Sequence, residues 1–302
     1  MRERVASPSP VVEWTCEANP ESVTREKARL LRDFGVDRVS LGAQSFEPAV
    51  LAALGRDHAP EQVFRALDLL RDAGFRRLSL DLMFAAPGET LAQLERDLAT
   101  LTSLHLDHVS AYCLTFEPGT PLTRLRAQGR VTQETDDVEL AQYRLVREQL
   151  AAGGLALYEI SNFARPGSES QHNQVYWRGE EYFGVGLGAG SYERGTRRSN
   201  TRELAAYLGE WGRDPLRPPH EAETLSPEAK ARERAILGLR LRAGIDPSEI
   251  AARGGLSLAE LYRDGEIGSL VTRGLLEEAS DGRLRLTDRG LELADEVFVE
   301  LV

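Results

Sequence analysis

Residues 35–46, GVDRVSLGAQSF, run from the end of one expected helix through a strand to a polar segment. Gly35 suits a helix end, because glycine adopts the left-handed conformation without strain. Residues 38–41 are predicted to form a short buried strand, and the segment that contains Gln44 and Ser45 is predicted to follow its end. The stretch therefore indicates one complete transition from helix to strand.

The same succession recurs through the first half of the chain. Further strands are predicted at residues 11–16, 78–83, 108–114 and 155–160. Helices are predicted at residues 22–34 (with Ser22 as N-cap), 61–73, 91–101 and 132–152. Strands that alternate with helices of this length form parallel βαβ units with the helices packed on the sheet. The pattern therefore predicts an α/β fold.

Polar or glycine-containing segments lie at or near the ends of several predicted strands. They are residues 17–20, residues 42–45, Asp81 and residues 115–119. Ligands of parallel α/β folds bind at the carboxyl ends of the strands. We therefore expect a binding site along this edge.

The second half of the chain has a different pattern. Periodicity weakens between residues 166 and 226, and residues 213–220 are predicted to be an exposed linker. Helices are then predicted at residues 227–241, 246–252 and 258–272, strands at 275–278 and 283–286 around Asp281-Gly282, and a last helix at 287–301. Three helices followed by a hairpin are typical of a small winged-helix-like domain. The predicted domains are residues 1–165, 166–226 and 227–302.

Composition narrows the classes of partner. The net charge of −11 argues against nucleic acid, and residues 227–302 also hold more acidic than basic side chains. We therefore expect the winged-helix-like domain to have a structural or protein-contact role. No apolar stretch approaches the roughly 18 residues of a membrane span, and the first fifteen residues lack the apolar core of a signal peptide. The expected location is cytoplasmic.

The cysteine count limits redox and metal chemistry. Cys16 and Cys113 are the only cysteines in the sequence. Two thiols exclude a disulfide framework and a self-contained site with three thiolate ligands. Because both lie among strand-like residues, we expect buried, reduced thiols.

Four motifs point to a family when they are taken together. They are EANP at residues 17–20, SLGAQSF at 40–46, LGRDH at 54–58 and HNQVYW at 172–177. In this order they resemble the HemW-type heme-chaperone branch of the oxygen-independent coproporphyrinogen III oxidase-like radical SAM family. The resemblance runs from about residue 11 to residue 302. It implies a partial (β/α) barrel that holds S-adenosylmethionine (SAM) at the carboxyl ends of its strands.

The resemblance places Glu17, Gln44, Arg56 and Asp81 at the positions that contact SAM. Their chemistry is compatible, because arginine suits the carboxylate of the ligand. Acidic and amide side chains suit its ammonium and hydroxyl groups. A single polar residue at a strand end is more often a helix cap or solvent-exposed, so the prediction depends on the four positions together.

The segment HNQVYW matches the HNxxYW signature of the heme-chaperone branch. Imidazole is a common axial ligand of heme iron, and neighbouring aromatic rings suit a flat macrocycle. His172 is therefore a candidate ligand for heme or porphyrin, and a client hemoprotein is the implied partner. The alternative is a hydrogen-bonded loop histidine. Tyr176 and Trp177 are expected to pack in the core or to line the heme site.

The family's cluster motif is absent from this sequence. Radical SAM relatives carry CxxxCxxC, which holds a 4Fe–4S cluster, and two βα units ahead of the position of residue 11. The expectation is therefore a barrel without its first two βα units, no cluster in this chain and no residue with an assigned catalytic role. An uncovered sheet edge at residues 11–16 suggests that Met1 is a late start and the natural protein is longer. The competing hypothesis is a sheet completed by a partner.

Three functions follow as alternatives. The first is a heme chaperone, which the HNxxYW signature favours. The second is a truncated oxygen-independent coproporphyrinogen III oxidase of porphyrin biosynthesis. The third is a non-catalytic remnant that binds porphyrin or a protein partner. Whether the protein is an enzyme stays open at this point.

Overall fold

A computed structural model describes residues 12–211, 220–263 and 265–302. The chain divides into two compact units, residues 1–171 and residues 172–302.

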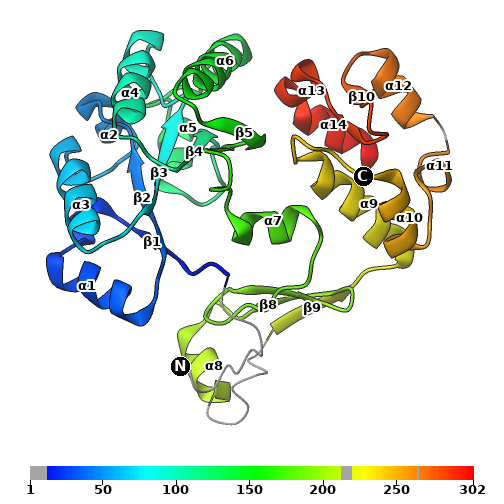
Figure 1. The fold of residues 1–302 in the computed structure, drawn as a ribbon, viewed down its shortest axis with the longest axis horizontal. Coiled ribbons are helices and arrows are strands. Elements are labelled where there is room, and N and C mark those ends of the chain that lie inside the picture. The colour runs from blue at the N-terminus through cyan, green and yellow to red at the C-terminus, as the bar shows by residue number, and fades with distance from the viewer. Residues whose placement is uncertain (1–11, 212–219, 264) are drawn as a thin grey trace. The chain divides into compact units, whose positions relative to one another are not determined.

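The first unit is built on a six-stranded sheet with the order β1-β2-β3-β4-β6-β5 (Figure 1). The strands are β1 (Thr15–Ala18), β2 (Arg38–Gln44), β3 (Arg77–Phe84), β4 (His108–Cys113), β5 (Ala156–Glu159) and β6 (Asn162–Ala164). Strands β1 to β4 pair in parallel, as the alternating pattern predicts. The helices are α1 (Arg25–Phe34), α2 (Pro48–Ala53), α3 (Pro60–Asp72), α4 (Leu91–Ser103), α5 (Pro121–Ala127) and α6 (Asp136–Ala152).

The core of this unit lies between the sheet and its helices. Every residue of β2 is buried. Leu67 and Leu70 of α3 and Leu94 and Leu98 of α4 are completely covered, and each belongs to the same apolar cluster as the strands. Burial of each such leucine stabilises the fold by about 1.5–3 kcal/mol. The sheet therefore holds the strand ends at fixed positions.

Several sequence predictions for this unit are wrong in detail. Ser22 does not cap a helix: it ends a short 3-10 helix, Pro20–Ser22, and Thr24 accepts the capping hydrogen bond from the Lys27 amide instead. Gly35 has the predicted left-handed conformation, with φ of 89°. The helix expected to start at residue 132 begins at Asp136, because the preceding residues form the separate helix α5 and a loop.

The strand expected at residues 155–160 does not continue the parallel series. It is β5, which forms an antiparallel hairpin with β6. Strand β6 lies next to β4 and is antiparallel to it. A chain that reverses after a two-residue turn at residues 160–161 can pair only in the antiparallel sense.

A buried ion pair joins three distant segments of the first unit. The side chains of Arg38 and Glu13 are 2% and 3% exposed, and their closest charged atoms are 3.1 Å apart. Arg38 also donates to the backbone oxygens of Ser168, at 2.7 Å, and Glu169, at 3.3 Å. The start of β2 is therefore tied to the segments before β1 and after β6.

The second unit contains a three-stranded antiparallel sheet and a group of short helices. The sheet has the order β7-β8-β9, with β7 (Gly190–Glu193), β8 (Thr196–Asn200) and β9 (His220–Thr224). The other elements are α7 (Gln171–Trp177), α8 (Leu204–Trp211), α9 (Pro227–Leu239), α10 (Pro247–Gly254), α11 (Leu258–Leu261), α12 (Glu266–Thr272), β10 (Leu276–Glu278), β11 (Leu284–Leu286), α13 (Asp288–Glu292) and α14 (Ala294–Leu301).

The predicted hairpin is confirmed, with Gly282 at φ of 80° in its turn. The helix expected at residues 258–272 is two helices, because Tyr262 leaves the helical conformation after α11. The last helix is likewise divided at Leu293. Residues 213–219 of the expected linker lie outside the described residues, and His220 is not linker but the first residue of β9.

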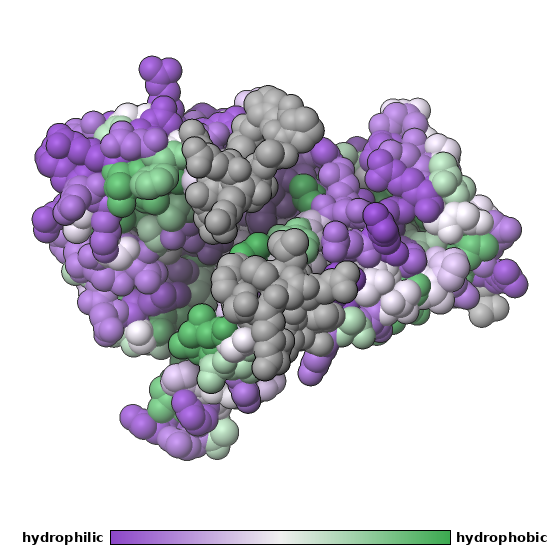
Figure 2. All heavy atoms as spheres, turned by 90° about the horizontal axis from the view of Figure 1, so that it is seen from below, coloured by the Kyte–Doolittle hydropathy of each residue, from purple (hydrophilic) through white to green (hydrophobic). Residues whose placement is uncertain are grey.

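The surface shown in Figure 2 is covered mainly by hydrophilic side chains, with smaller hydrophobic areas between them. None of the helices in the described residues is both long enough and apolar enough to cross a membrane.

Candidate functional site

Asp81 is the centre of a polar cluster on the parallel strands. Its carboxylate accepts a hydrogen bond from the Ser40 hydroxyl at 3.0 Å, across the β2–β3 pair. Burial raises the pKa of Asp81, and hydrogen bonds from Ser40 and Ser110 lower it. The charge of Glu17 raises the pKa further, whereas that of Arg56 lowers it. The charges of Glu17 and Arg56 therefore both act on Asp81, which groups three of the four predicted SAM residues around one carboxylate.

Gln44, the fourth predicted residue, lies at the end of β2. It is buried and has a φ of 67°, which is strained for a residue with a side chain. A Cβ atom on Gly42 would lie 3.0 Å from Gln44 Nε2 and 3.6 Å from Asn19 Oδ1. Glycine at position 42 therefore leaves room for the Gln44 amide beside Asn19, two residues after Glu17.

The sequence did not single out the extension of this polar cluster onto β4 and β6. Burial raises the pKa of the Tyr112 hydroxyl, and the neighbouring side chains of Ser110 and Asn162 lower it. Asn162 in turn donates to the buried carboxylate of Glu159. The alternation of Ser110 and Tyr112 on one strand was a usable signal, but the partners on β5 and β6 depend on the unforeseen hairpin.

The polar side chains around Asp81 fit SAM as a ligand. The two cysteines, in contrast, do not fit a 4Fe–4S cluster. The polar cluster combines buried and exposed carboxylates, an amide and an arginine, which match the ammonium, hydroxyl and carboxylate groups of the ligand. Burial, followed by the charge of Glu17, raises the pKa of Cys16. Burial and Glu139 raise the pKa of Cys113 to about 12, so both thiols resist forming the thiolate that iron requires.

Both thiols are half-buried rather than fully buried as expected. Across the described ranges, no group of three or more His, Cys, Asp and Glu side chains is arranged to hold a metal ion. That the chain forms no cluster stays a prediction.

The HNxxYW segment folds as α7 and presents His172 at the surface. Because the two residues are one helical turn apart, the Tyr176 hydroxyl reaches His172 Nε2 at 3.0 Å. Their rings meet edge to face, with centroids 4.9 Å apart. The ring centroids of Tyr176 and Tyr182 are 4.6 Å apart, and those of Tyr182 and Tyr192 are 6.4 Å apart. His172 therefore stands at one end of a row of aromatic rings.

Trp177 packs against Arg240, whose guanidinium lies 4.3 Å from the centre of its ring.

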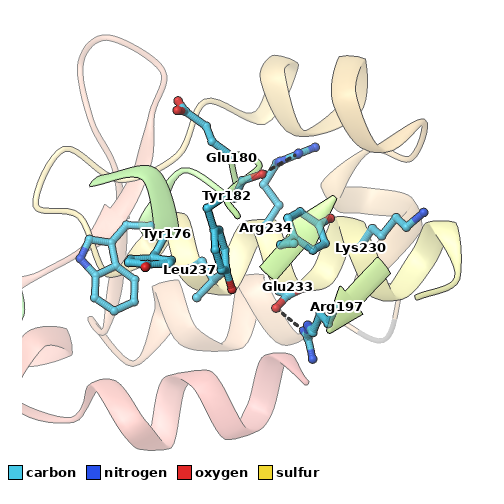
Figure 3. A pocket seen from close by; sticks show the side chains of 11 residues that line it. Tyr176, Glu180, Tyr182, Arg197, Lys230, Glu233, Arg234 and Leu237 are labelled. Atoms are coloured by element: carbon cyan, nitrogen blue, oxygen red, sulfur yellow. Dashed lines mark hydrogen bonds and ion pairs between the residues drawn. The ribbon is translucent and has the colours of Figure 1, made fainter. Parts of the chain in front are cut away.

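The aromatic row borders a pocket of about 270 Å³ within the second unit. Figure 3 shows tyrosine rings and charged side chains around it. Its lining residues are Tyr176, Trp177, Gly179, Glu180, Tyr182, Tyr192, Arg197, Lys230, Glu233, Arg234 and Leu237. The lining residues from β7, β8 and α9 could not be predicted from the sequence, because no local motif marks them.

Comparison of the chain with known proteins shows which family it belongs to. The family model "Radical SAM superfamily" matches residues 2–101, and "HemN C-terminal domain" matches residues 225–293. The heme chaperone HemW of Bacillus subtilis (strain 168) is 39% identical over 99% of this chain and 78% of its own length. The chain belongs to the HemW family. Heme chaperone HemW of Mycobacterium tuberculosis is 38% identical over 97% of this chain and 73% of its own.

A solved structure supports the fold of this HemW-family chain. The Escherichia coli coproporphyrinogen III oxidase HemN, described as a radical SAM enzyme, superposes with a TM-score of 0.79 over 96% of this chain and 69% of its own. The two sequences are 20% identical, so this likeness concerns the fold alone. The expected α/β radical SAM-type fold is confirmed. The division of the second unit near residue 226 stays a prediction, which the match at residues 225–293 supports.

Proposed function

We propose that this chain binds heme through His172 and passes it to a client hemoprotein. The observation that carries the proposal is the exposed His172 imidazole on α7, at the end of the aromatic row. The relatives with near-complete matches are named heme chaperones, which supports this function over porphyrin oxidation. The alternative oxidase is supported only at the level of the fold. A cytoplasmic location remains a prediction.

The proposal for His172 predicts a spectroscopic change. Ferric heme added to the chain is expected to shift its Soret band, because an imidazole nitrogen enters the iron's axial position. His172→Ala is expected to lose this shift and to bind heme at least about tenfold more weakly. Visible absorption titration measures both.

A matched control is His105→Asn, which removes another exposed imidazole from a position with φ of 52° that asparagine tolerates. This variant is expected to bind heme as the parent chain does. Equal loss in both variants would show that the imidazole of His172 has no special role.

We also propose that Glu17, Gln44, Arg56 and Asp81 hold SAM in the first unit. When bound, SAM supplies a sulfonium group. Arg56 would bind the carboxylate of the ligand, whereas the carboxylates and the Gln44 amide would orient its ammonium and hydroxyl groups. The support is the electrostatic grouping around Asp81 and the space that Gly42 leaves for Gln44.

The SAM proposal predicts a loss of affinity in Arg56→Met. Removing a charge-assisted contact is expected to raise the Kd for SAM about tenfold, measured by calorimetric titration. Arg65→Met, at an exposed position of α3, makes the same chemical change away from the strand ends. An affinity that is the same in both variants would contradict the assignment of Arg56.

A further inference from the structure

The pocket beside α7 combines aromatic walls with an excess of positive charge. Arg197, Lys230 and Arg234 line it together with two acidic side chains, Glu180 and Glu233. Figure 3 shows the paired Arg197 and Glu233 on one side of the pocket and Lys230 extending at its rim. This local excess stands out in a chain whose net charge is −11.

The three cations differ in how their charge is satisfied. Arg197 contacts the carboxylates of Glu233 and Glu223, so it is neutralised within the protein. Arg234 donates only to the backbone oxygen of Gly179, at 3.1 Å, and its Nε atom is buried without a hydrogen-bond acceptor in the described part of the chain. Within the same residues, no carboxylate lies at ion-pair distance from Lys230. Two cations at the pocket are therefore available to an anionic ligand.

We propose that this pocket receives the carboxylate-bearing edge of the tetrapyrrole, with Lys230 and Arg234 binding its carboxylates. The proposal rests on the proposed function, because heme is the ligand that it places. The rings of Tyr176 and Tyr182 would contact the flat macrocycle. The Arg234 guanidinium has N–H groups beyond the one that donates to Gly179, and with a carboxylate in the pocket these would form charge-assisted hydrogen bonds.

The size of the pocket sets how the ligand would lie. Its volume of about 270 Å³ is just below the usual range of roughly 300–1,000 Å³ for ligand pockets, so it holds one edge of a tetrapyrrole and leaves the rest outside. The Tyr176–His172 hydrogen bond connects the pocket wall to the exposed imidazole. The carboxylates and the iron would thus be held by separate groups of the same unit.

Iron-free protoporphyrin tests the pocket separately from iron ligation. Its fluorescence reports binding to the full chain. Because the ring contains no iron, His172 has no metal to ligate. Lys230→Met and Arg234→Met are each expected to raise the Kd about tenfold. Arg253→Met, on the exposed face of α10, is the matched control and is expected to leave the Kd unchanged.

The dimethyl ester of protoporphyrin makes the complementary change in the ligand. It is expected to bind the parent chain about tenfold more weakly than the diacid and to be insensitive to Lys230→Met. Arg234→Lys keeps the positive charge and is expected to bind the diacid more tightly than Arg234→Met. A thermal melt of each variant shows whether it is folded. If Arg234→Met does not fold, the protoporphyrin affinity of Lys230→Met, at the rim of the pocket, tests the proposal.

The two proposals fail in different ways. If His172→Ala abolishes the heme Soret shift while Lys230→Met and Arg234→Met bind protoporphyrin normally, the pocket proposal is overturned and heme ligation stands. If heme gives no Soret shift but protoporphyrin binding depends on Lys230 and Arg234, ligation by His172 fails and the pocket proposal stands. Equal binding of the diacid and the diester also overturns the pocket proposal.

Discussion

Arg38→Met is expected to lower the free energy of unfolding by about 3–5 kcal/mol. The substitution removes the positive partner of Glu13, whose side chain is 3% exposed. It also removes the donor to the backbone oxygens of Ser168 and Glu169. The cost is large because the Glu13 carboxylate loses its buried charged partner while it stays covered, and restoring its hydration requires the start of β2 to open. Urea unfolding followed by circular dichroism measures the change.

Arg77→Met is the matched control for this experiment. Arg77 also lies near Glu13, at 3.7 Å, but its side chain is 38% exposed and shares its charge with Asp37. Its loss is expected to cost less than about 1 kcal/mol. In a Glu13→Gln background, Arg38→Met is expected to cost much less than in the parent chain. The same cost in both backgrounds would show that the ion pair is not the source.

The parallel part of the sheet could be predicted from local pattern. Strand β2 carries Val39 and Leu41 between a helix-ending Gly35 and the polar segment that follows, so its position follows from neighbouring residues alone. The hairpin of β5 and β6 could not be placed in this way. Its position in the sheet depends on the pairing of β6 with β4, whose partner residues lie at least 52 positions earlier in the sequence (Asn162 with Ser110), and nothing in the hairpin itself indicates that partner.

The two candidate sites differ in the same way: one is indicated by local sequence pattern, and the other depends on contacts between distant segments. Asp81 lies within a strand whose carboxyl end should face a ligand, and the family resemblance assigned it to SAM. Its grouping with Glu17 follows from the parallel strands, whereas Arg56 lies in the loop after α2, which strand pairing does not place. Lys230 and Arg234 were not predicted, because on α9 they look like ordinary charged residues of an exposed helix face. Their significance depends on the tyrosines of a distant segment.

Glu89 is a buried carboxyl group in the loop between β3 and α4. It is 5% exposed and accepts a hydrogen bond from the Ala86 amide at 3.2 Å, while its Oε1 atom has no partner among the described residues. Burial raises its pKa to about 7, and the charge of the nearby Asp97 adds to this effect. Burial likewise raises the pKa of Asp97 to about 6, although Ser45 and the Phe46 amide stabilise its charge.

The raised pKa of Glu89 makes the first unit less stable as pH increases. The unfolded chain releases this proton near pH 4.5, whereas the folded chain keeps it until about pH 7. Between these values the folded state binds more protons, so the contribution is complete below pH 4.5 and is lost as pH rises to 7. The difference corresponds to about 3 kcal/mol at about 1.36 kcal/mol per pKa unit.

The pH dependence of stability that His108 contributes has the opposite sign to that of Glu89. Burial lowers the pKa of His108 to about 3, so its contribution is present above pH 6.5 and is lost as pH falls. Its ring is satisfied as a neutral group by Ser79 at 2.8 Å and Tyr158 at 2.9 Å. The stability of the parent chain alone would therefore mix the effects of Glu89 and His108 with that of the raised pKa of Asp97. The informative quantity is the difference in stability between a Glu89 variant and the parent at each pH.

Glu89→Gln is expected to stabilise the protein by about 3 kcal/mol at pH 8 and by less than about 1 kcal/mol at pH 4.5. Glutamine has the shape of the protonated acid and cannot ionise, so the variant avoids the loss of stability that the parent undergoes between pH 4.5 and about pH 7. Glu95→Gln, on the exposed face of α4, is the control and is expected to change stability little at either pH. Urea unfolding at the two pH values measures both variants. A gain of the same size at pH 4.5 and pH 8 would indicate better packing rather than the removal of a titrating group.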